Sequence, residues 1–239
     1  MNHNKQIENL QVLYEDNHCI AVFKPAGILS QGDASGDTSI FKEVKKYLKE
    51  KYKKPGNVFL GLLHRLDRPV SGIMLFAKTS KGAKRLSEQF RNHMIEKKYQ
   101  ALVCGVLSQN KGVLVNRLGK DKKLKKAKEY ADGKEARLYY EVLKTNGKYS
   151  LLEISIDTGK FHQIRAQLSL AGLPILGDIK YRGEKWENET SIALCATELH
   201  FQAVTEDKEI HLNIEIPKNW QDYFIHSAGL VRDLNSSDN

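Results

Sequence analysis

Residues 58–77 read VFLGLLHRLDRPVSGIMLFA, two apolar runs joined by a short and highly charged connection. Each run, 58–63 and 72–77, has the length and composition of a core strand. The connection carries one carboxylate, Asp67, between Arg65 and Arg68. An exposed salt bridge would account for these charges. Polar residues between buried strands are nevertheless often functional, because a rigid scaffold fixes their position. The stretch therefore predicts a sheet protein with a candidate site at Asp67.

Outward from this stretch, apolar periodicity predicts further strands and helices. Amphipathic helices are expected over 39–54 and 80–93, and a third after residue 160 with Ile164, Leu168 and Ala171 on its apolar face. Strands are expected within 12–24, which holds two, and at 99–106, 136–143, 150–156, 192–201 and 210–216. No linker or repeat divides the chain, so we expect a single α+β domain over 1–239, with a core at about 12–217 and a frayed tail after about 228.

The composition indicates a basic protein made and kept in the cytoplasm. The net charge is +9 and the sequence pI about 9.3, which favours a polyanionic partner, although many basic proteins bind none. No apolar run reaches the ~20 residues of a membrane span, and the N-terminus has no signal core. Cys19, Cys104 and Cys195 stand apart in apolar runs without metal-binding spacing, which is typical of buried reduced thiols.

Two basic segments are candidates for contact with that polyanion. Residues 118–130 carry six lysines and break the strand pattern, so they are expected to form a solvated, mobile loop. A second reading gives Lys122, Lys123, Lys125 and Lys126 contacts with RNA phosphate. Near the third helix, Lys160, His162 and Arg165 form a potential anion site, for a phosphate or for a carboxylate such as Asp67. These three could also be ordinary solvated residues of a helix.

Several enzyme classes lack their sequence signature. The chain has no GxGxxG or Walker-type phosphate loop, and no GxSxG elbow surrounds Ser71. Its histidines lack metal-ligand spacing, and no second acid accompanies Asp67. What remains is one ionised carboxylate among cations. Such a group can act as a nucleophile at a sugar carbon.

Several motifs, taken in order, resemble one enzyme family. HRLDRPVSGIMLFAKT is preceded by KPAGI and followed by KKYQALVCG, GKEARLYYEV and TGKFHQIRAQLSLAGLPILGDIKY. This series, which spans about residues 12–217, resembles the RluA-type RNA pseudouridine synthases. The resemblance implies a mixed, mostly antiparallel central sheet flanked by helices, with an active-site cleft and no cofactor or metal.

The resemblance also implies residue roles. Asp67 takes the place of the catalytic aspartate, and Arg165 that of the arginine paired with it. Arg65 is associated with the flipped-out nucleotide, and Tyr99 stacks on the target uracil. His64, Lys160 and His162 remain possible RNA contacts, as do the four lysines named above.

Two positions depart from the family pattern. Val70 stands where many members have threonine, and Lys160 where many have arginine. Both changes preserve local size or charge, so we expect altered contacts and retained chemistry. About eleven residues precede the first strand, so we expect no separate N-terminal RNA-binding domain.

The sequence thus predicts a monomeric enzyme, with no membrane or metal partner, that isomerises uridine to pseudouridine in structured RNA. Transfer RNA and large-subunit ribosomal RNA remain open as substrates. A non-catalytic RNA-binding or RNA-folding protein with the same fold is the alternative. A glycosylase that releases free uracil is a weaker one.

Overall fold

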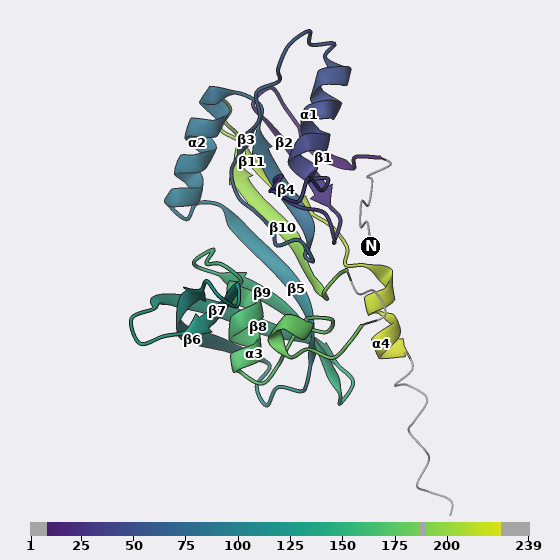
Figure 1. Ribbon diagram of the computed structural model, residues 1–239, viewed down its shortest axis with the longest axis vertical. Helices are drawn as coiled ribbons and strands as arrows, with labels where there is room; N and C mark the ends of the chain where they lie inside the picture. Colours follow the sequence, from purple (N-terminus) through teal and green to yellow (C-terminus); the bar gives the residue numbers. More distant parts are fainter. Residues whose placement is uncertain (1–8, 187–189, 226–239) are drawn as a thin grey trace, which may run out of the picture.

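The computed structural model describes residues 9–186 and 190–225, which form one mixed sheet with helices packed on it (Figure 1). Nine of the eleven strands in these residues follow the order β1-β2-β4-β10-β5-β9-β8-β6-β7, and the other two lie off this path, β3 paired to β4 and β11 to β10. The strands are β1 (Val12–Glu15), β2 (Cys19–Lys24), β3 (Gly61–Leu62), β4 (Ser71–Ala77), β5 (Glu96–Cys104), β6 (Lys111–Asp121), β7 (Lys126–Glu129), β8 (Lys134–Thr145), β9 (Tyr149–Ile156), β10 (Leu194–Gln202) and β11 (Glu209–Asn213). The helices are α1 (Ile40–Lys51), α2 (Ser80–Arg91), α3 (Gln163–Leu170) and α4 (Asp222–Ile225), with the short 3-10 helices η1 (Ile179–Tyr181) and η2 (Lys218–Trp220).

The strand pairing is antiparallel between the named strands of the described chain except where β4 lies beside β10. There Ser71 faces Cys195 and Gly72 faces Ala196 in parallel register. Gly72 has a φ of 128°, and a Cβ at this position would collide with the backbone of Ala196. Glycine is therefore needed for β4 to approach β10 so closely. The predicted α+β class, with a mixed and mostly antiparallel sheet, is confirmed.

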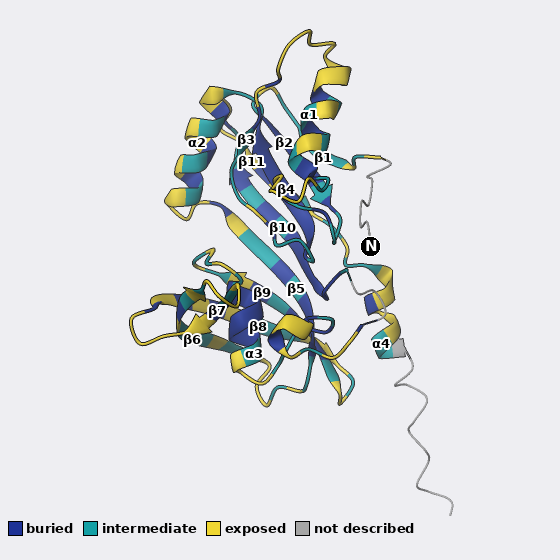
Figure 2. Cartoon of the chain, in the orientation of Figure 1, coloured by how far each residue is buried: buried dark blue, intermediate teal, exposed yellow. Residues whose placement is uncertain are grey.

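The apolar run of β4 is continuous because helices cover both faces of the strand (Figure 2). Met74 and Phe76 pack in one cluster with the buried residues of α1, while Ile73 and Leu75 pack in another with Leu86 of α2. In Figure 1 these strands and helices make the upper half of the molecule. The HRLDRPV connection leads directly into this rigid strand.

The lower half holds β6 to β9 and α3, and β5 runs from one half to the other (Figure 1). Buried glutamines anchor α3 to the sheet. The side chain of Gln167 donates to the carbonyl oxygens of Leu114 and Ala136, and that of Gln163 donates to the carbonyl of Arg137. The helix is buried over most of its surface, although Ala171, expected on its apolar face, is exposed. The buried residues of α3 include Gln163, Arg165 and Gln167, which are polar or charged. A prediction based only on a stripe of apolar residues therefore missed most of the buried surface of this helix.

Two other predicted elements were wrong. The run at 58–63 forms strand only at β3, although Val58 and Leu60 are buried. The lysine segment 118–130 is an ordered hairpin of β6 and β7, in which only residues 122–125 form the turn. Its strand β7 forms because Ala127 packs inward and is 5% exposed, between the half-buried Lys126 and the exposed Lys128. The predicted tail after about 228 lies outside the described residues.

Candidate active site

The loop that carries Asp67 is held on both sides by buried polar groups. The Ser30 hydroxyl accepts from the Leu66 amide at 3.0 Å and donates to the Leu66 carbonyl at 2.5 Å. Lys24, fully buried, donates to the carbonyl oxygens of Ile28 and Arg68, at 2.8 and 3.3 Å, and to that of its neighbour Pro25. Burial lowers the pKa of Lys24 to about 7, against the opposing charge of Asp67. The KPAGI segment thus fixes the loop next to β4.

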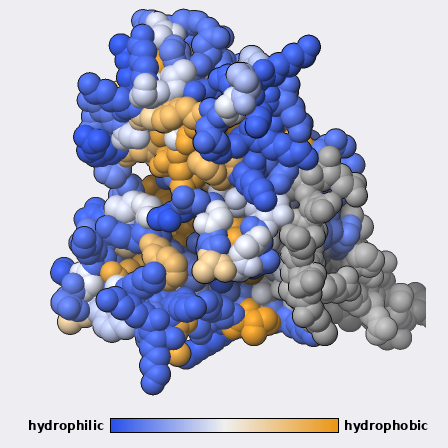
Figure 3. Space-filling model, turned by 45° about the horizontal axis from the view of Figure 1, so that its top comes forward, coloured by the Kyte–Doolittle hydropathy of each residue, from blue (hydrophilic) through white to orange (hydrophobic). Residues whose placement is uncertain are grey.

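Asp67 meets Arg165 across the boundary between the two halves of the sheet. The Nη1 atom of Arg165 lies 3.0 Å from Oδ2 of Asp67, so a loop before β4 is tied to helix α3. The Asp67 side chain is 27% exposed, while that of Arg165 is 6% exposed. The carboxylate therefore has a fixed position and remains open to a ligand from one side. In the space-filling view, a hollow separates the upper and lower parts of the molecule (Figure 3).

Arg165 is itself held by a second carboxylate, Asp178, which the sequence reasoning missed. The Nε and Nη2 atoms of Arg165 donate to the two carboxylate oxygens of Asp178 at 2.7 and 2.8 Å. Arg165 does pair with Asp67, as the resemblance implied, but its guanidinium fork lies on Asp178, and Asp67 receives the third nitrogen. Burial alone would lower the pKa of Arg165, yet the hydrogen bonds and charges of Asp178 and Asp67 raise it. The arginine is permanently charged and fixed in orientation.

His162 is the second neighbour of Asp67, with Nε2 at 3.5 Å from Oδ2. It immediately precedes α3 in a left-handed conformation, with a φ of 53°. Its Nδ1 lies 3.0 Å from the hydroxyl of Tyr181, which accepts from the Ala127 amide at 2.7 Å. The same hydroxyl donates to the Ala127 carbonyl at 3.5 Å, so Tyr181 links His162 to β7. Burial lowers the pKa of His162 to about 4, against the opposing charge of Asp67, so the ring is neutral at pH 7.

Tyr99 lies on β5, which pairs with β9 and β10 at Ile154 and Ala196. It is 7% exposed, and its hydroxyl has no hydrogen-bond partner in the described part of the chain. Burial, together with the nearby charge of Asp67, raises the pKa of the Tyr99 hydroxyl. A buried aromatic ring whose hydroxyl has no partner among the described residues therefore lies within range of the Asp67 charge.

The other charged residues of the connection point elsewhere. Arg65 is exposed and has no ion-pair partner among residues 9–186 and 190–225. Arg68 pairs with Asp37 at 2.8 Å and donates to the carbonyl of Gly27. His64 accepts from the Leu75 amide at 2.9 Å, and burial, with the charge of Lys97, lowers its pKa to about 3. Arg65 is thus an exposed cation of this loop without an ion-pair partner among the described residues.

The lysine hairpin lies against η1, next to this cluster. The Nζ atom of Lys180 donates to the Lys125 carbonyl at 3.1 Å, and Lys126 lies over the Tyr181 ring at 5.6 Å. Lys122, Lys123 and Lys125 are exposed, and Lys126 is half-buried. Lys160 is also half-buried, and its backbone amide donates to the Gln163 side chain. The hairpin thus presents cations beside the residues that hold Asp67.

The comparisons with known proteins agree on one family. The RNA pseudouridylate synthase family matches residues 18–170 of this chain. Ribosomal large subunit pseudouridine synthase C of Rickettsia prowazekii is 34% identical over 218 residues, which cover 89% of this chain and 70% of that protein. An uncharacterized RNA pseudouridine synthase of Bacillus subtilis is 28% identical over 88% of this chain and 70% of its own length. The solved structure of human RNA pseudouridylate synthase domain containing 4 covers 91% of both chains with a TM-score of 0.72 and 25% identity.

The chain belongs to the RNA pseudouridylate synthase family. It is an RNA pseudouridine synthase, an isomerase whose substrate is RNA. The resemblance of its HRLDRPVSG and HQIR motifs to this family is therefore confirmed, and the non-catalytic alternative is not favoured. A second human structure, RNA pseudouridylate synthase domain containing 1, shares the fold over 94% of this chain with a TM-score of 0.67 and 19% identity.

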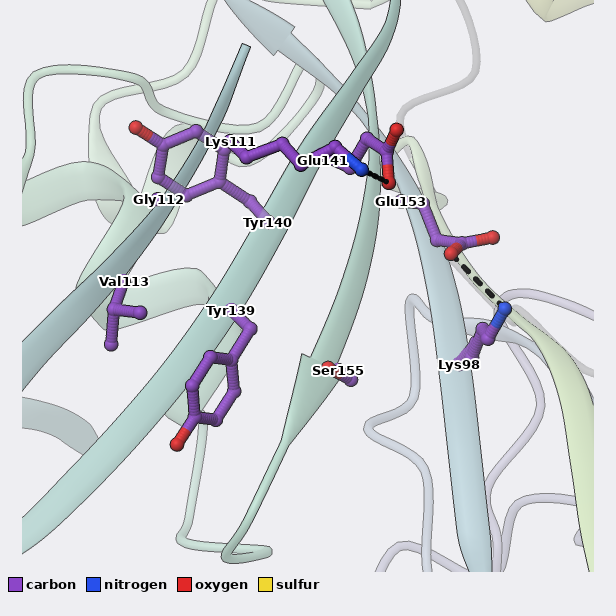
Figure 4. Close-up of a pocket in the computed structure, with 9 residues that line it drawn as sticks. All are labelled: Lys98, Lys111, Gly112, Val113, Tyr139, Tyr140, Glu141, Glu153 and Ser155. Carbon is purple, nitrogen blue, oxygen red and sulfur yellow. Dashed lines mark ion pairs between the residues drawn. The ribbon is translucent and has the colours of Figure 1, made fainter. Parts of the chain in front are cut away.

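A pocket of this synthase, drawn in Figure 4, does not have Asp67 among its lining residues. Its volume is about 430 Å³, and its lining residues come from β5, β6, β8 and β9: Lys98, Lys111, Gly112, Val113, Tyr139, Tyr140, Glu141, Glu153 and Ser155. Side chains alternate along a strand, so Lys98 faces away from the side of β5 that carries Tyr99. The charged residues that line the pocket already form ion pairs with each other, Lys98 with Glu153 and Lys111 with Glu141. The Asp67 cluster therefore remains the candidate active site.

Neither a metal site nor a membrane span is found in the part of the chain that the structure describes. No group of three or more His, Cys, Asp or Glu side chains in residues 9–186 and 190–225 is arranged to hold a metal ion. Within the same ranges no helix has the length and apolar character needed to cross a membrane. The three cysteines are free, with Cys104 only half-buried.

Proposed function

We propose that Asp67 is the catalytic carboxylate of this synthase and that its substrate is a uridine of large-subunit ribosomal RNA. The observation that carries the proposal is the fixed but accessible position of Asp67, 3.0 Å from Arg165 and close to Tyr99. A carboxylate held by a buried guanidinium keeps its charge. Its 27% exposure leaves room for a ribose to approach. The choice of ribosomal RNA follows the printed name of the Rickettsia relative.

The isomerisation exchanges one bond for another at the same sugar. The bond from N1 of uracil to C1′ of the ribose breaks, and a bond from C5 to C1′ forms. A proton leaves C5 and N1 gains one, so no water or outside reactant enters the balance. Asp67 starts the reaction at the ribose, either by attack on the sugar carbon or by removal of a sugar proton.

Tyr99 and Arg65 serve the flipped nucleotide in this proposal. A base within a helix does not expose its glycosidic bond, so the uridine must leave the stack. Tyr99 provides an aromatic face on which the freed uracil can turn before it is rejoined through C5. Arg65, exposed and without an ion-pair partner among the described residues, fills the space that the uridine leaves in the RNA.

The remaining basic residues bind the RNA backbone. The turn of the lysine hairpin brings cations beside η1, and we assign phosphate contacts to Lys122, Lys123, Lys125, Lys126 and Lys160. His162 contributes its neutral ring next to Asp67. His64 acts on RNA binding indirectly, because its contact with the Leu75 amide positions the loop of Arg65.

We further propose that one domain, residues 1–239, carries the activity as a cytoplasmic monomer without a cofactor. Incubation with RNA labelled in the uracil ring tests the function. Pseudouridine in the RNA supports the proposal, free uracil would indicate a glycosylase, and unchanged RNA would indicate a binding protein. Pseudouridine mapping in cells with and without the gene then identifies the position. A target in transfer RNA would overturn the choice of ribosomal RNA.

A further inference from the structure

Phe161 is an exposed aromatic residue next to the active site that the chemistry above does not use. It is 40% exposed and immediately precedes His162, the neighbour of Asp67. Single exposed apolar side chains are common at protein surfaces, so the fixed orientation of this ring and its place beside the site are what single it out. The proposal below rests on the proposed function, because it takes RNA as the substrate of the same site.

The Phe161 ring is held in place by a stack. Its centroid lies 3.8 Å from that of His162, and the two planes differ by 19°. The Nζ atom of Lys120, on β6, lies 4.6 Å from the Phe161 centroid. Since His162 covers one face of the ring, the ammonium lies over the other. Lys120 is exposed and its side chain is flexible, so this ammonium can move aside from the 40% exposed ring.

We propose that the outer face of Phe161 is a stacking platform for the base of a nucleotide adjacent to the target uridine. A flat base that arrives over this face displaces the Lys120 ammonium, which can then pair with the phosphate of the same nucleotide. Phe161 reaches Asp67 through His162 alone, whose Nε2 lies 3.5 Å from the carboxylate, so the platform borders the reaction site.

Tyr99 does not compete for this role, because it is only 7% exposed. A buried ring suits the base that enters the site, whereas a half-exposed ring suits a base that remains outside. In this proposal Tyr99 therefore contacts the target uracil, and Phe161 contacts the base of the neighbouring nucleotide. Phe161 is a specificity-determining residue for the nucleotide beside the uridine.

Binding of a short single-stranded RNA to the full chain tests the platform. The probe has one uridine between adenosines, and a second probe carries abasic ribose in place of those adenosines, with the same phosphates. Phe161→Leu keeps an apolar side chain but loses the aromatic face. It should weaken binding of the first probe by about 5- to 150-fold, the range for one lost base stack. Phe161→Leu should not change binding of the abasic probe. Phe161→Trp, which keeps an aromatic face, should bind the adenosine probe with the affinity of the wild type.

Two controls separate stacking from charge and from general surface effects. Phe59→Leu removes another half-exposed phenylalanine, 49% exposed and just before β3, and should leave both affinities unchanged. Lys120→Ala should reduce the salt dependence of binding by about one phosphate contact, whereas Phe161→Leu should not.

Equal losses on the two probes, or no loss on either, would overturn the platform. Because the measurement is of binding, it is independent of catalysis. If the wild-type chain forms no pseudouridine, the proposed function fails while the platform is still judged by the two probes. If pseudouridine forms and Phe161→Leu binds the adenosine probe normally, the platform alone fails.

Discussion

Replacement of Arg165 by lysine perturbs the contact on which the site depends. Three nitrogens of Arg165 bond to two carboxylates, two to Asp178 at 2.7 and 2.8 Å and one to Asp67 at 3.0 Å. Lysine keeps the charge but has one nitrogen, which cannot reproduce these separate directions. In Arg165→Lys either Asp178 loses its forked partner or Asp67 loses its anchor.

The size of the effect follows from the burial of the group. Each hydrogen bond to a charged group contributes about 1.5–3 kcal/mol, and at least one is lost. The side chains of Arg165 and Asp178 are 6% and 1% exposed, so water replaces little of that loss. Because lysine keeps the positive charge, we expect the free energy of unfolding to fall by about 1.5–3 kcal/mol, the contribution of one such hydrogen bond. A shift of Asp67 by about 1 Å should lower the rate about 100-fold.

Urea unfolding and single-turnover formation of pseudouridine measure the two effects. Arg68→Lys is the matched control, since Arg68 also bonds to a carboxylate and lies one residue from Asp67. Its side chain is 38% exposed, so its ion pair with Asp37 should contribute less than about 1 kcal/mol. The control should react at the wild-type rate. A wild-type rate and stability for Arg165→Lys would refute the reasoning.

Two further predictions concern the hairpin and the pH dependence of stability. Alanine at the lysines of the hairpin turn and its edge should weaken RNA binding and flatten its salt dependence, with turnover at saturating RNA little changed; an unaltered slope would exclude phosphate contacts by Lys122, Lys123, Lys125 and Lys126. The folded chain holds His64 neutral, with a pKa of about 3, whereas the unfolded chain takes up a proton near pH 6.5. The contribution of neutral His64 to the free energy of unfolding is therefore fully present above pH 6.5 and is lost as the pH falls toward 3. His64→Gln keeps an acceptor for the Leu75 amide, so its urea midpoint should fall less than that of the wild type between pH 7 and 4; parallel curves would contradict the assignment.

The sequence was informative where one physical signal dominated. The run SGIMLFA predicted a core strand because both faces of β4 are covered, and the loop before it placed Asp67 at the strand end. Ser30 and Lys24 fix that loop through backbone carbonyls and amides. Such contacts between distant segments leave no periodic pattern, so their role could not be predicted from the sequence.

The lysine hairpin and Asp178 show where sequence reasoning failed. The run of lysines predicted a loop because like charges repel. In the structure Ala127 is buried and its backbone amide donates to the Tyr181 hydroxyl, and these two contacts hold β7 against the rest of the fold. Asp178 is the acid within ILGDIKY, directly after an apolar segment, and a buried carboxylate needs a cation as partner. That signal was present in the sequence, yet the identity of the partner required the structure.

Single-turnover pseudouridine formation by Asp67→Asn, at saturating RNA, tests the central claim most directly. Asparagine keeps the shape of the side chain and removes its charge and nucleophilicity. We predict no pseudouridine, with RNA binding equal to that of the wild type or tighter, because repulsion between the carboxylate and phosphate is relieved. Appreciable pseudouridine from Asp67→Asn would contradict the assignment of Asp67 as the catalytic carboxylate.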